Sequence, residues 1–445
     1  MPLAMARSKT AATVAAIILS ATIPVFGQLT AQDAGNIFTN FYNTFYVSSS
    51  GGGEYIWQQG GSFDKNDEWE NAEMIEMTID RYIAAPNATD SNAMTALLNG
   101  FDKAYGADWT GDIYNDDIMW CILAHARAYL ALYNVTGTIN SSMSNWANIA
   151  SNNFSWVYNG GHSPGRILPQ YDNTFGGGMW WTTNHLGSPN YADITKNSCV
   201  NGPAALAGFY LSLIFPNAGF QTDAKNMINW ETTYLVQSDG FLYDHYATNG
   251  PVGSDLSYNV GTYVGAAGFL GTGIPETVAD YYTNYDCPSD ILPNWGTGGE
   301  NNDGFNGIFL RWVGTYELLS KHTNWIGFFN NQAVAAWAVT NASGLSWDNW
   351  TTTTANSGLY SWDCSASVSA LQWVQISQSA TAPLAPLREK LTFTNSAANR
   401  LQLNWTYGTL QSSANLGGPY TTVTLTPPYS VPITSLRRYY RILEN

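Results

Sequence analysis

Apolar residues that recur at three- and four-residue steps are the dominant pattern of this sequence between about residues 30 and 377. This spacing predicts about twelve amphipathic helices, which we place near 31–46, 67–83, 90–104, 116–134, 141–153, 191–214, 219–236, 256–271, 275–286, 305–320, 324–340 and 365–377. The segments between them include three long stretches, and loops of that length are usually functional: 50–64, 155–190 and 287–304. Helices paired by short and long connections suit a toroid of helical hairpins. We therefore predict an all-α (α/α)6 barrel whose long loops line a cleft at one end.

The two ends of the chain differ from this helical part. Residues 1–27 have a basic start, a short apolar run and small residues at a cleavage site, which indicates a secretory signal. The run is too short to span a bilayer, so we expect an exported protein, secreted or periplasmic, without membrane insertion. After a linker at 378–388, short alternating runs broken by Gly and Pro predict a small β-rich module over 389–445. We favour a structural or export-related role for it over attachment to carbohydrate or a cell surface. The predicted catalytic domain is 28–377.

The charge balance excludes one large class of partners. The net charge is −16, with only 17 Lys and Arg and no basic run. Because such a chain repels phosphate backbones, nucleic-acid binding is excluded. The aromatic content of 14% serves core filling, sugar stacking or both.

Four cysteines fit an oxidising compartment: Cys121, Cys199, Cys287 and Cys364. Three full pairings remain open. No two of them have metal-finger spacing, so we expect no structural zinc.

Two adjacent carboxylates, Asp116 and Asp117, stand at the start of a strongly apolar helix. We predict Asn115 as the N-cap of this helix, which puts both acids in the first turn, where the helix dipole favours negative charge. Capping and dipole compensation alone would explain many such pairs. Trp120 follows at once, however, so the pair borders a core rather than open solvent.

Other catalytic constellations fail on chemical grounds. The sequence Gly-His-Ser-Pro-Gly at 161–165 matches a nucleophile elbow, but Pro164 lacks the backbone N–H that the oxyanion hole requires. The five histidines are scattered and form no zinc-hydrolase motif. Calcium-loop, P-loop and dinucleotide fingerprints are also missing. We expect neither a metal nor an organic cofactor.

A carboxylate pair in an aromatic cleft suits glycoside hydrolysis, which needs one group to donate a proton and another to attack or to activate water. Each charge raises the pKa of its neighbour, so Asp116 and Asp117 form one coupled titrating system. The Gly-rich loop at 176–181 offers a platform for a sugar ring. Its predicted substrate-binding residues are Gly177, Trp180 and Trp181, and those of the helix start near 257 are Tyr258 and Asn259.

These motifs together resemble those of glycoside hydrolase family 76, the endo-α-1,6-mannanases. The resemblance covers about residues 30–377, and its most specific part is the double-Asp helix combined with the Gly-Trp-Trp loop. It is carried by Tyr-Asn-Asp-Asp-Ile-Met-Trp at 114–120, Gly-Gly-Gly-Met-Trp-Trp at 176–181, Lys196-Asn197, Asn201-Gly202, Tyr-Asn-Val-Gly at 258–261, Phe-Asn-Gly-Ile-Phe-Leu-Arg at 305–311 and Trp-Asp-Cys-Ser at 362–365. Two departures are Asn115, where an aromatic residue is common, and Val260, where Gln is frequent.

The resemblance implies an (α/α)6 barrel that cleaves the α-1,6-linked backbone of mannan with retention. It makes Asp116 the nucleophile and Asp117 the acid/base, an assignment that helix geometry alone leaves open. We expect a monomer whose partner is the polysaccharide. Three alternatives remain: a transglycosylase with the same residues, a non-catalytic mannan-binding protein, and a hydrolase or lyase for another glycan.

Overall fold

The computed structural model describes residues 29–48, 55–57, 68–183, 194–295, 303–320, 323–378 and most of 392–443. The predicted signal segment at 1–27 and nearly all of the predicted linker lie outside the described residues. The described part is mostly helical and contains twelve α-helices: α1 (Ala31–Phe45), α2 (Glu68–Ala84), α3 (Ala88–Tyr105), α4 (Asn115–Thr136), α5 (Ser141–Asn159), α6 (Ser198–Ile214), α7 (Phe220–Tyr234), α8 (Ser257–Leu270), α9 (Pro275–Tyr281), α10 (Phe305–Ser320), α11 (Ile326–Ala338) and α12 (Ser361–Gln378).

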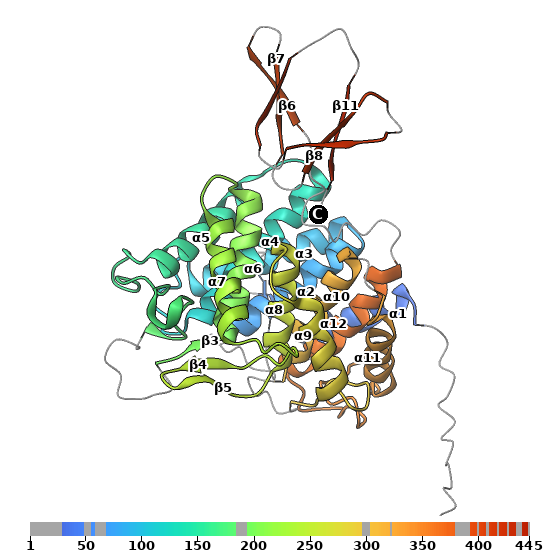
Figure 1. The fold of residues 1–445 in the computed structure, drawn as a ribbon. Helices are drawn as coiled ribbons and strands as arrows, with labels where there is room; N and C mark the ends of the chain where they lie inside the picture. Colours follow the sequence, from blue (N-terminus) through green and yellow to red (C-terminus); the bar gives the residue numbers. More distant parts are fainter. Residues whose placement is uncertain are drawn as a thin grey trace, which may run out of the picture.

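The even-numbered helices pack against one another in chain order, and α12 also packs against α2. The odd-numbered helices lie outside them (Figure 1): α3 contacts α2, α5 contacts α4, α7 contacts α6, α9 contacts α8, and both α1 and α11 contact α12. The sequence explains this division. Nearly every residue of α6 is buried, whereas α7 buries one stripe that includes Phe220, Ala224 and Trp230. A helix that is apolar all round belongs in the interior, and an amphipathic helix belongs at the surface.

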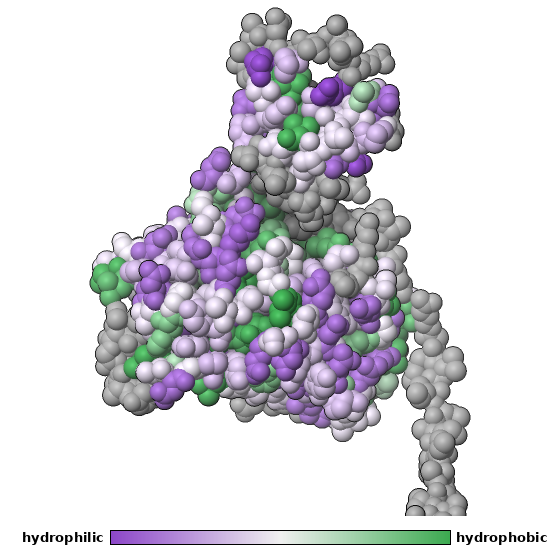
Figure 2. Space-filling model, in the orientation of Figure 1, coloured by the Kyte–Doolittle hydropathy of each residue, from purple (hydrophilic) through white to green (hydrophobic). Residues whose placement is uncertain are grey.

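Glycine permits the close packing of α8 on α10. A Cβ at Gly261 would lie 2.7 Å from the Cα of Phe309, which is closer than real contacts allow. The two helix backbones therefore meet directly at this point. Hydrophilic side chains cover much of the outer face of the helical part, and hydrophobic residues occur there in smaller separate patches (Figure 2).

Short strands complete the molecule. The strands β1 (Tyr46–Ser48) and β2 (Tyr55–Trp57) form a hairpin, and β3 (Lys196–Asn197), β4 (His245–Ala247) and β5 (Gly250–Val252) form an antiparallel sheet beside the helix ends. The C-terminal region contains two three-stranded antiparallel sheets, in the orders β10-β7-β6 and β11-β8-β9. Their strands are β6 (Thr392–Ala397), β7 (Arg400–Asn404), β8 (Thr409–Ser413), β9 (Thr421–Thr424), β10 (Tyr429–Pro432) and β11 (Tyr439–Leu443). A separate small core holds Leu403, Trp405 and Leu410.

The helix predictions are close to the observed elements, and the differences are local. The helix predicted at 275–286 is α9 followed by a π-helical turn, η4 (Tyr282–Asp286). Strands β3 to β5 were not predicted, because they are two or three residues long and carry no alternating pattern. All four cysteines are buried free thiols. Within the described residues, no helix is long and apolar enough to cross a membrane.

Candidate active site

A cavity of about 690 Å³ lies where the even-numbered helices begin. Each of α2, α4, α6, α8 and α10 contributes its first or second residue to the wall, namely Trp69, Asp116, Cys199, Tyr258 and Phe305. The remaining lining residues are Tyr114, Asp117, Trp120, Trp181, Thr195, Asn197, Asp244, His245, Ala247 and Leu256. Helix N-termini carry partial positive charge and unpaired N–H groups. Their convergence favours negative charge and hydroxyl ligands inside this cavity.

The start of α4 is fixed by Asn115, but not as a cap. Tyr114 is the N-cap and makes no side-chain cap hydrogen bond, so the prediction of Asn115 as N-cap is wrong. Asn115 is the first helical residue and is fully buried. Its Nδ2 donates to the carbonyl of Trp180 at 2.8 Å, and its Oδ1 accepts from Nε of Arg166 at 3.1 Å. The polar side chain therefore ties α4 to the loop around 166–181.

Arg166 fixes the backbone of the segment that precedes α4. It is 2% exposed, and its guanidinium donates to the carbonyl of Thr110 at 2.8 Å and to that of Asp112 at 2.7 Å. Burial lowers the pKa of Arg166 to about 10. Because its donors reach backbone carbonyls, this cation serves the shape of the loop and leaves the carboxylates of the cavity unneutralised.

Asp116 and Asp117 meet in the cavity with no Lys or Arg among the described residues that line it. Burial raises the pKa of Asp116 to about 6, although hydrogen bonds from the Cys199 thiol and the Trp181 indole oppose the rise. Burial, and then the charge of Asp116, raise the pKa of Asp117 well above its usual range. A hydrogen bond with Asp112 raises it further. Asp116 is thus the group that ionises first, while Asp117 keeps its proton.

The two neighbouring indoles of the glycine-rich loop have different surroundings. Trp181 lines the cavity, donates from Nε1 to Oδ2 of Asp116 at 3.3 Å, and lies 5.2 Å from the ring of Tyr114. Trp180 is 4% exposed and does not line the cavity; its Nε1 donates to Asp172 at 3.0 Å. Trp181 is therefore placed to meet a ligand, whereas Trp180 packs behind the wall.

The glycine-rich loop is shaped by a buried lysine. Nζ of Lys196 donates to the carbonyls of Gly177 and Gly178 at 2.7 and 2.8 Å and to Asp172 at 2.7 Å. Burial lowers the pKa of Lys196 to about 8. Gly177 has a φ of +128°, which favours glycine, and it does not line the cavity. Its place in the structure is that of a turn in the loop that carries Trp181.

Of the two residues predicted on α8, Tyr258 lines the cavity and stacks on Phe305 with ring centroids 3.9 Å apart. Asn259 lies behind the wall, fully buried, and its Nδ2 donates to Oδ1 of Asp244 at 3.0 Å. Asp244 is also 2.8 Å from Nδ1 of His245.

Sequence reasoning missed Asp244 and His245, which both line the cavity. In the sequence, their only signal was an adjacent Asp and His between aromatic residues. Within the described residues, no three His, Cys, Asp or Glu side chains are grouped so that they could hold a metal ion.

A comparison with family models matches residues 30–387 to glycosyl hydrolase family 76. Because this match covers most of the chain, the protein belongs to that family. A comparison with curated protein sequences finds no match.

Solved structures share the fold at low sequence identity. The GH76A α-1,6-mannanase of Salegentibacter sp. HEL1_6 is 23% identical, with a TM-score of 0.62 over 77% of this chain and 98% of that chain. The family 76 mannosidase Bt3792 of Bacteroides thetaiotaomicron is 17% identical, with a TM-score of 0.58 over 78% and 98%. Dfg5 of Chaetomium thermophilum, solved with glucosamine, is 15% identical, with a TM-score of 0.60 over 78% and 90%.

Proposed function

We propose that this protein is an endo-acting glycoside hydrolase that cleaves α-1,6-mannosidic linkages in mannan with retention. One observation carries the proposal: Asp116 and Asp117 lie together in an aromatic cavity at converging helix ends, with no Lys or Arg among its described lining residues. We further infer that the ring of contacts among the even-numbered helices closes an (α/α)6 barrel. The cavity lies at its N-terminal mouth.

The unequal acidities of the pair suit the two roles of a retaining enzyme. Asp116, the first to ionise, attacks the anomeric carbon while the bond from that carbon to the leaving oxygen breaks. Asp117 gives its proton to that oxygen. The ester formed on Asp116 carries no charge, so the largest of the charge effects that raise the pKa of Asp117 disappears and that pKa falls. Asp117 can then take a proton from water, which attacks the anomeric carbon and releases Asp116.

The other polar groups of the cavity suit sugar hydroxyls. Asp244 is held by Asn259, and it in turn orients His245. Tyr258 and Trp181 supply ring faces, and the Trp181 indole N–H also fixes Asp116. We propose that a mannosyl ring stacks against Trp181 with its hydroxyls toward Asp244 and His245.

A relative supports this assignment. An inactive variant of the Salegentibacter enzyme, in which two consecutive aspartates are replaced, was solved in complex with α-1,6-mannotetrose. Asp116 and Asp117 are a consecutive pair in this chain. We also propose that the protein is exported, acts as a monomer, and carries its β-rich C-terminal module as a structural or export-related unit.

The proposal is tested by incubating the mature protein with linear α-1,6-mannan and following reducing ends together with product size. Early release of short oligosaccharides is expected for an endo-acting hydrolase. Products longer than the substrate in the presence of an added acceptor would identify a transglycosylase. Binding of mannan without any new reducing ends, by a folded protein, would contradict catalysis and indicate a binding protein.

A further inference from the structure

Four aromatic side chains form a continuous group at the surface beside the cavity, which we name the aromatic platform: Phe241, Tyr243, Tyr281 and Tyr285. Ring centroids are 4.9 Å apart between Phe241 and Tyr243, 5.7 Å between Phe241 and Tyr281, and 4.8 Å between Tyr281 and Tyr285. None of the four lines the catalytic cavity. The group therefore lies outside the site described above.

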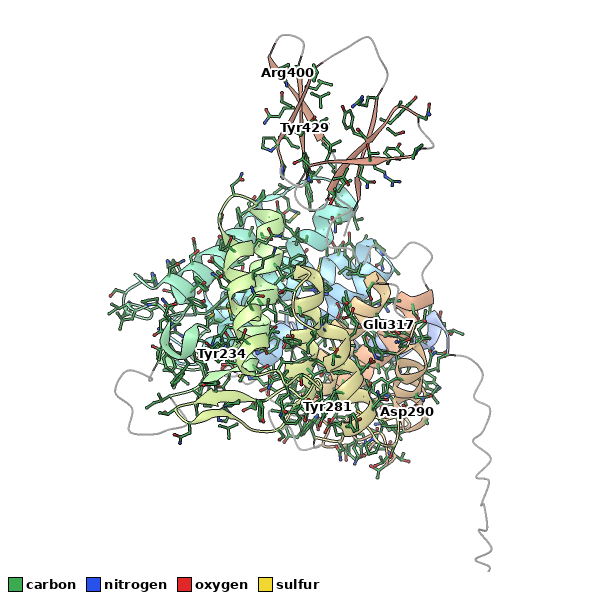
Figure 3. The ribbon with its side chains drawn as sticks, in the orientation of Figure 1. Tyr234, Tyr281, Asp290, Glu317, Arg400 and Tyr429 are labelled. Atoms are coloured by element: carbon green, nitrogen blue, oxygen red, sulfur yellow. The ribbon has the colours of Figure 1, made fainter. Side chains whose placement is uncertain are left out.

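Two chain connections join the platform to the cavity wall. Tyr243 precedes the lining residue His245 by two positions, about 7 Å in extended backbone. On the other side, Asp286 is close enough to Asp255 for its charge to raise the pKa of that carboxyl, and Leu256, the neighbour of Asp255, lines the cavity. Figure 3 shows Tyr281 at the same end of the helical part at which Figure 1 shows β4 and β5. The platform thus continues the surface of the cavity outward.

The local structure presents Tyr285 to solvent rather than burying it. Tyr285 is 72% exposed, the largest fraction among the exposed large hydrophobic residues described. It belongs to the π-helical turn η4, and such turns occur frequently at functional sites. Tyr281 stands one turn earlier and supports it. An exposed ring of this size contributes little to the core, so packing does not account for its position.

The charged residues around the aromatic platform indicate which class of ligand it binds. Desolvation raises the pKa of Tyr281, and the negative charges of Asp286, Asp255 and Asp239 raise it further. A surface that combines tyrosine faces with negative charge repels polyanions and suits an uncharged ligand with apolar faces and many hydroxyls. Sugar rings of a neutral glycan have both properties.

We propose that the aromatic platform binds further sugar residues of the same polymer whose linkage is cleaved in the cavity. This inference rests on the proposed function and assigns it a remote subsite. Its consequence is a preference for long chains, because a short oligosaccharide occupies the cavity alone and does not reach Tyr285.

The test compares wild type with Tyr285→Ala on linear α-1,6-mannan and on a short α-1,6-linked manno-oligosaccharide. We expect KM for the polymer to rise about three- to tenfold, with kcat/KM for the oligosaccharide unchanged. Tyr285→Phe keeps the ring and should restore most of the polymer affinity. Ile139→Ala is the matched control, because Ile139 is 54% exposed and follows the C-terminal end of α4, away from the cavity.

Equal effects of Tyr285→Ala on both substrates, or no effect on either, would overturn the platform. The failure of the proposed function is distinguishable, since wild type would then hydrolyse neither substrate. In that case affinity electrophoresis through a gel that contains mannan tests binding by the aromatic platform independently of hydrolysis. Retardation of wild type that is lost in Tyr285→Ala would support it, and equal mobility would overturn it.

Discussion

Helices α2 and α4 carry acidic side chains at two depths, and the two groups differ in their partners. At the mouth, Asp116 and Asp117 line the cavity, and the described residues that line it with them include no Lys or Arg. Deeper in the core, acids and guanidiniums form a closed ion cluster: Glu73, Glu76, Asp80, Arg127 and Arg311. Asp117 and Arg127 are ten residues apart on α4, about 15 Å along the axis.

Burial raises the pKa of carboxyls in both groups, including Glu73 and Glu76 of the deep cluster, where Arg311 and Arg127 oppose the rise without cancelling it. At Asp80 the two cations outweigh burial. Burial alone would raise the pKa of Asp80, yet Arg127 at 2.6 Å and Arg311 at 2.6 Å hold it below the usual value. Burial raises the pKa of Asp117 well above the usual value, and no Lys or Arg lines the cavity beside it among the described residues. The comparison teaches that α2 supplies carboxylates that pair with arginine in the core, whereas α4 presents Asp116 and Asp117 to the cavity.

The largest expected effect is on catalysis at the mouth. Asp116→Asn removes the proposed nucleophile and should lower kcat on mannan by roughly 10³-fold or more. Asp117→Asn removes the proposed general acid and should lower kcat by about 10²–10⁴-fold. Reducing-end release measures both. A substrate whose leaving group departs without protonation should recover much of the activity of Asp117→Asn and none of that of Asp116→Asn. Recovery of Asp116→Asn alone would reverse the roles.

The next largest effect is on stability in the deep cluster. Arg127→Met leaves Glu76 and Asp80 short of a buried partner and should cost about 3–5 kcal/mol of unfolding free energy. Chemical denaturation followed by tryptophan fluorescence measures this. Arg81→Met is the matched control, because Arg81 pairs with Asp90 nearer the surface and should cost less. Equal losses in the two variants would contradict a special role for the deep cluster.

A smaller effect is expected from replacing Asp112, whose charge acts on Asp117. Asp112→Asn removes a negative charge that raises the pKa of Asp117. Asp116 and Glu68 remain to raise it, so the basic limb of the pH–kcat/KM profile should move down without disappearing. Activity at the optimum should fall less than about tenfold. If the basic limb stays at its wild-type pH, or if the rate falls by the same factor at every pH, Asp112 acts only on structure.

The smallest expected effect is on stability, because the raised pKa of Asp117 lowers the free energy of unfolding at neutral pH. A carboxyl with a raised folded pKa destabilises the fold as pH rises above its unfolded value near 4. Asp117→Asn removes that penalty, so its melting temperature should exceed that of wild type by about 2 °C at pH 7. The difference should vanish near pH 4, where both chains carry a neutral group. A lower melting temperature at pH 7 would mean that Asp117 stabilises the fold.

Much of this arrangement follows from local sequence. The three- and four-residue recurrence located the helices, and the adjacent acids before Trp120 located the cavity. The family resemblance is confirmed by the match over residues 30–387. Helix starts were less certain, because Asn115 has the chemistry of a cap but is drawn inward by Arg166.

Other features depend on contacts that are distant in sequence. Trp180 and Trp181 are adjacent and chemically alike, but their indoles have different partners: Trp180 donates to the half-buried Asp172 and Trp181 to Asp116. The partners of Lys196 and Arg166 are mainly backbone carbonyls, which any residue can supply. Asp244 joins the cavity through a short strand whose sequence shows no alternation. Propensity and periodicity carry none of this information.

The most direct test of the contrast between the two regions is the pH dependence of kcat/KM on α-1,6-mannan. Ionisation of Asp116 should produce an acidic limb near pH 6, and loss of the Asp117 proton should produce a basic limb at higher pH. A bell-shaped profile of this kind would support the unequal acidities of Asp116 and Asp117 at the mouth. An acidic limb near pH 4, the value of an ordinary carboxyl, would contradict the account.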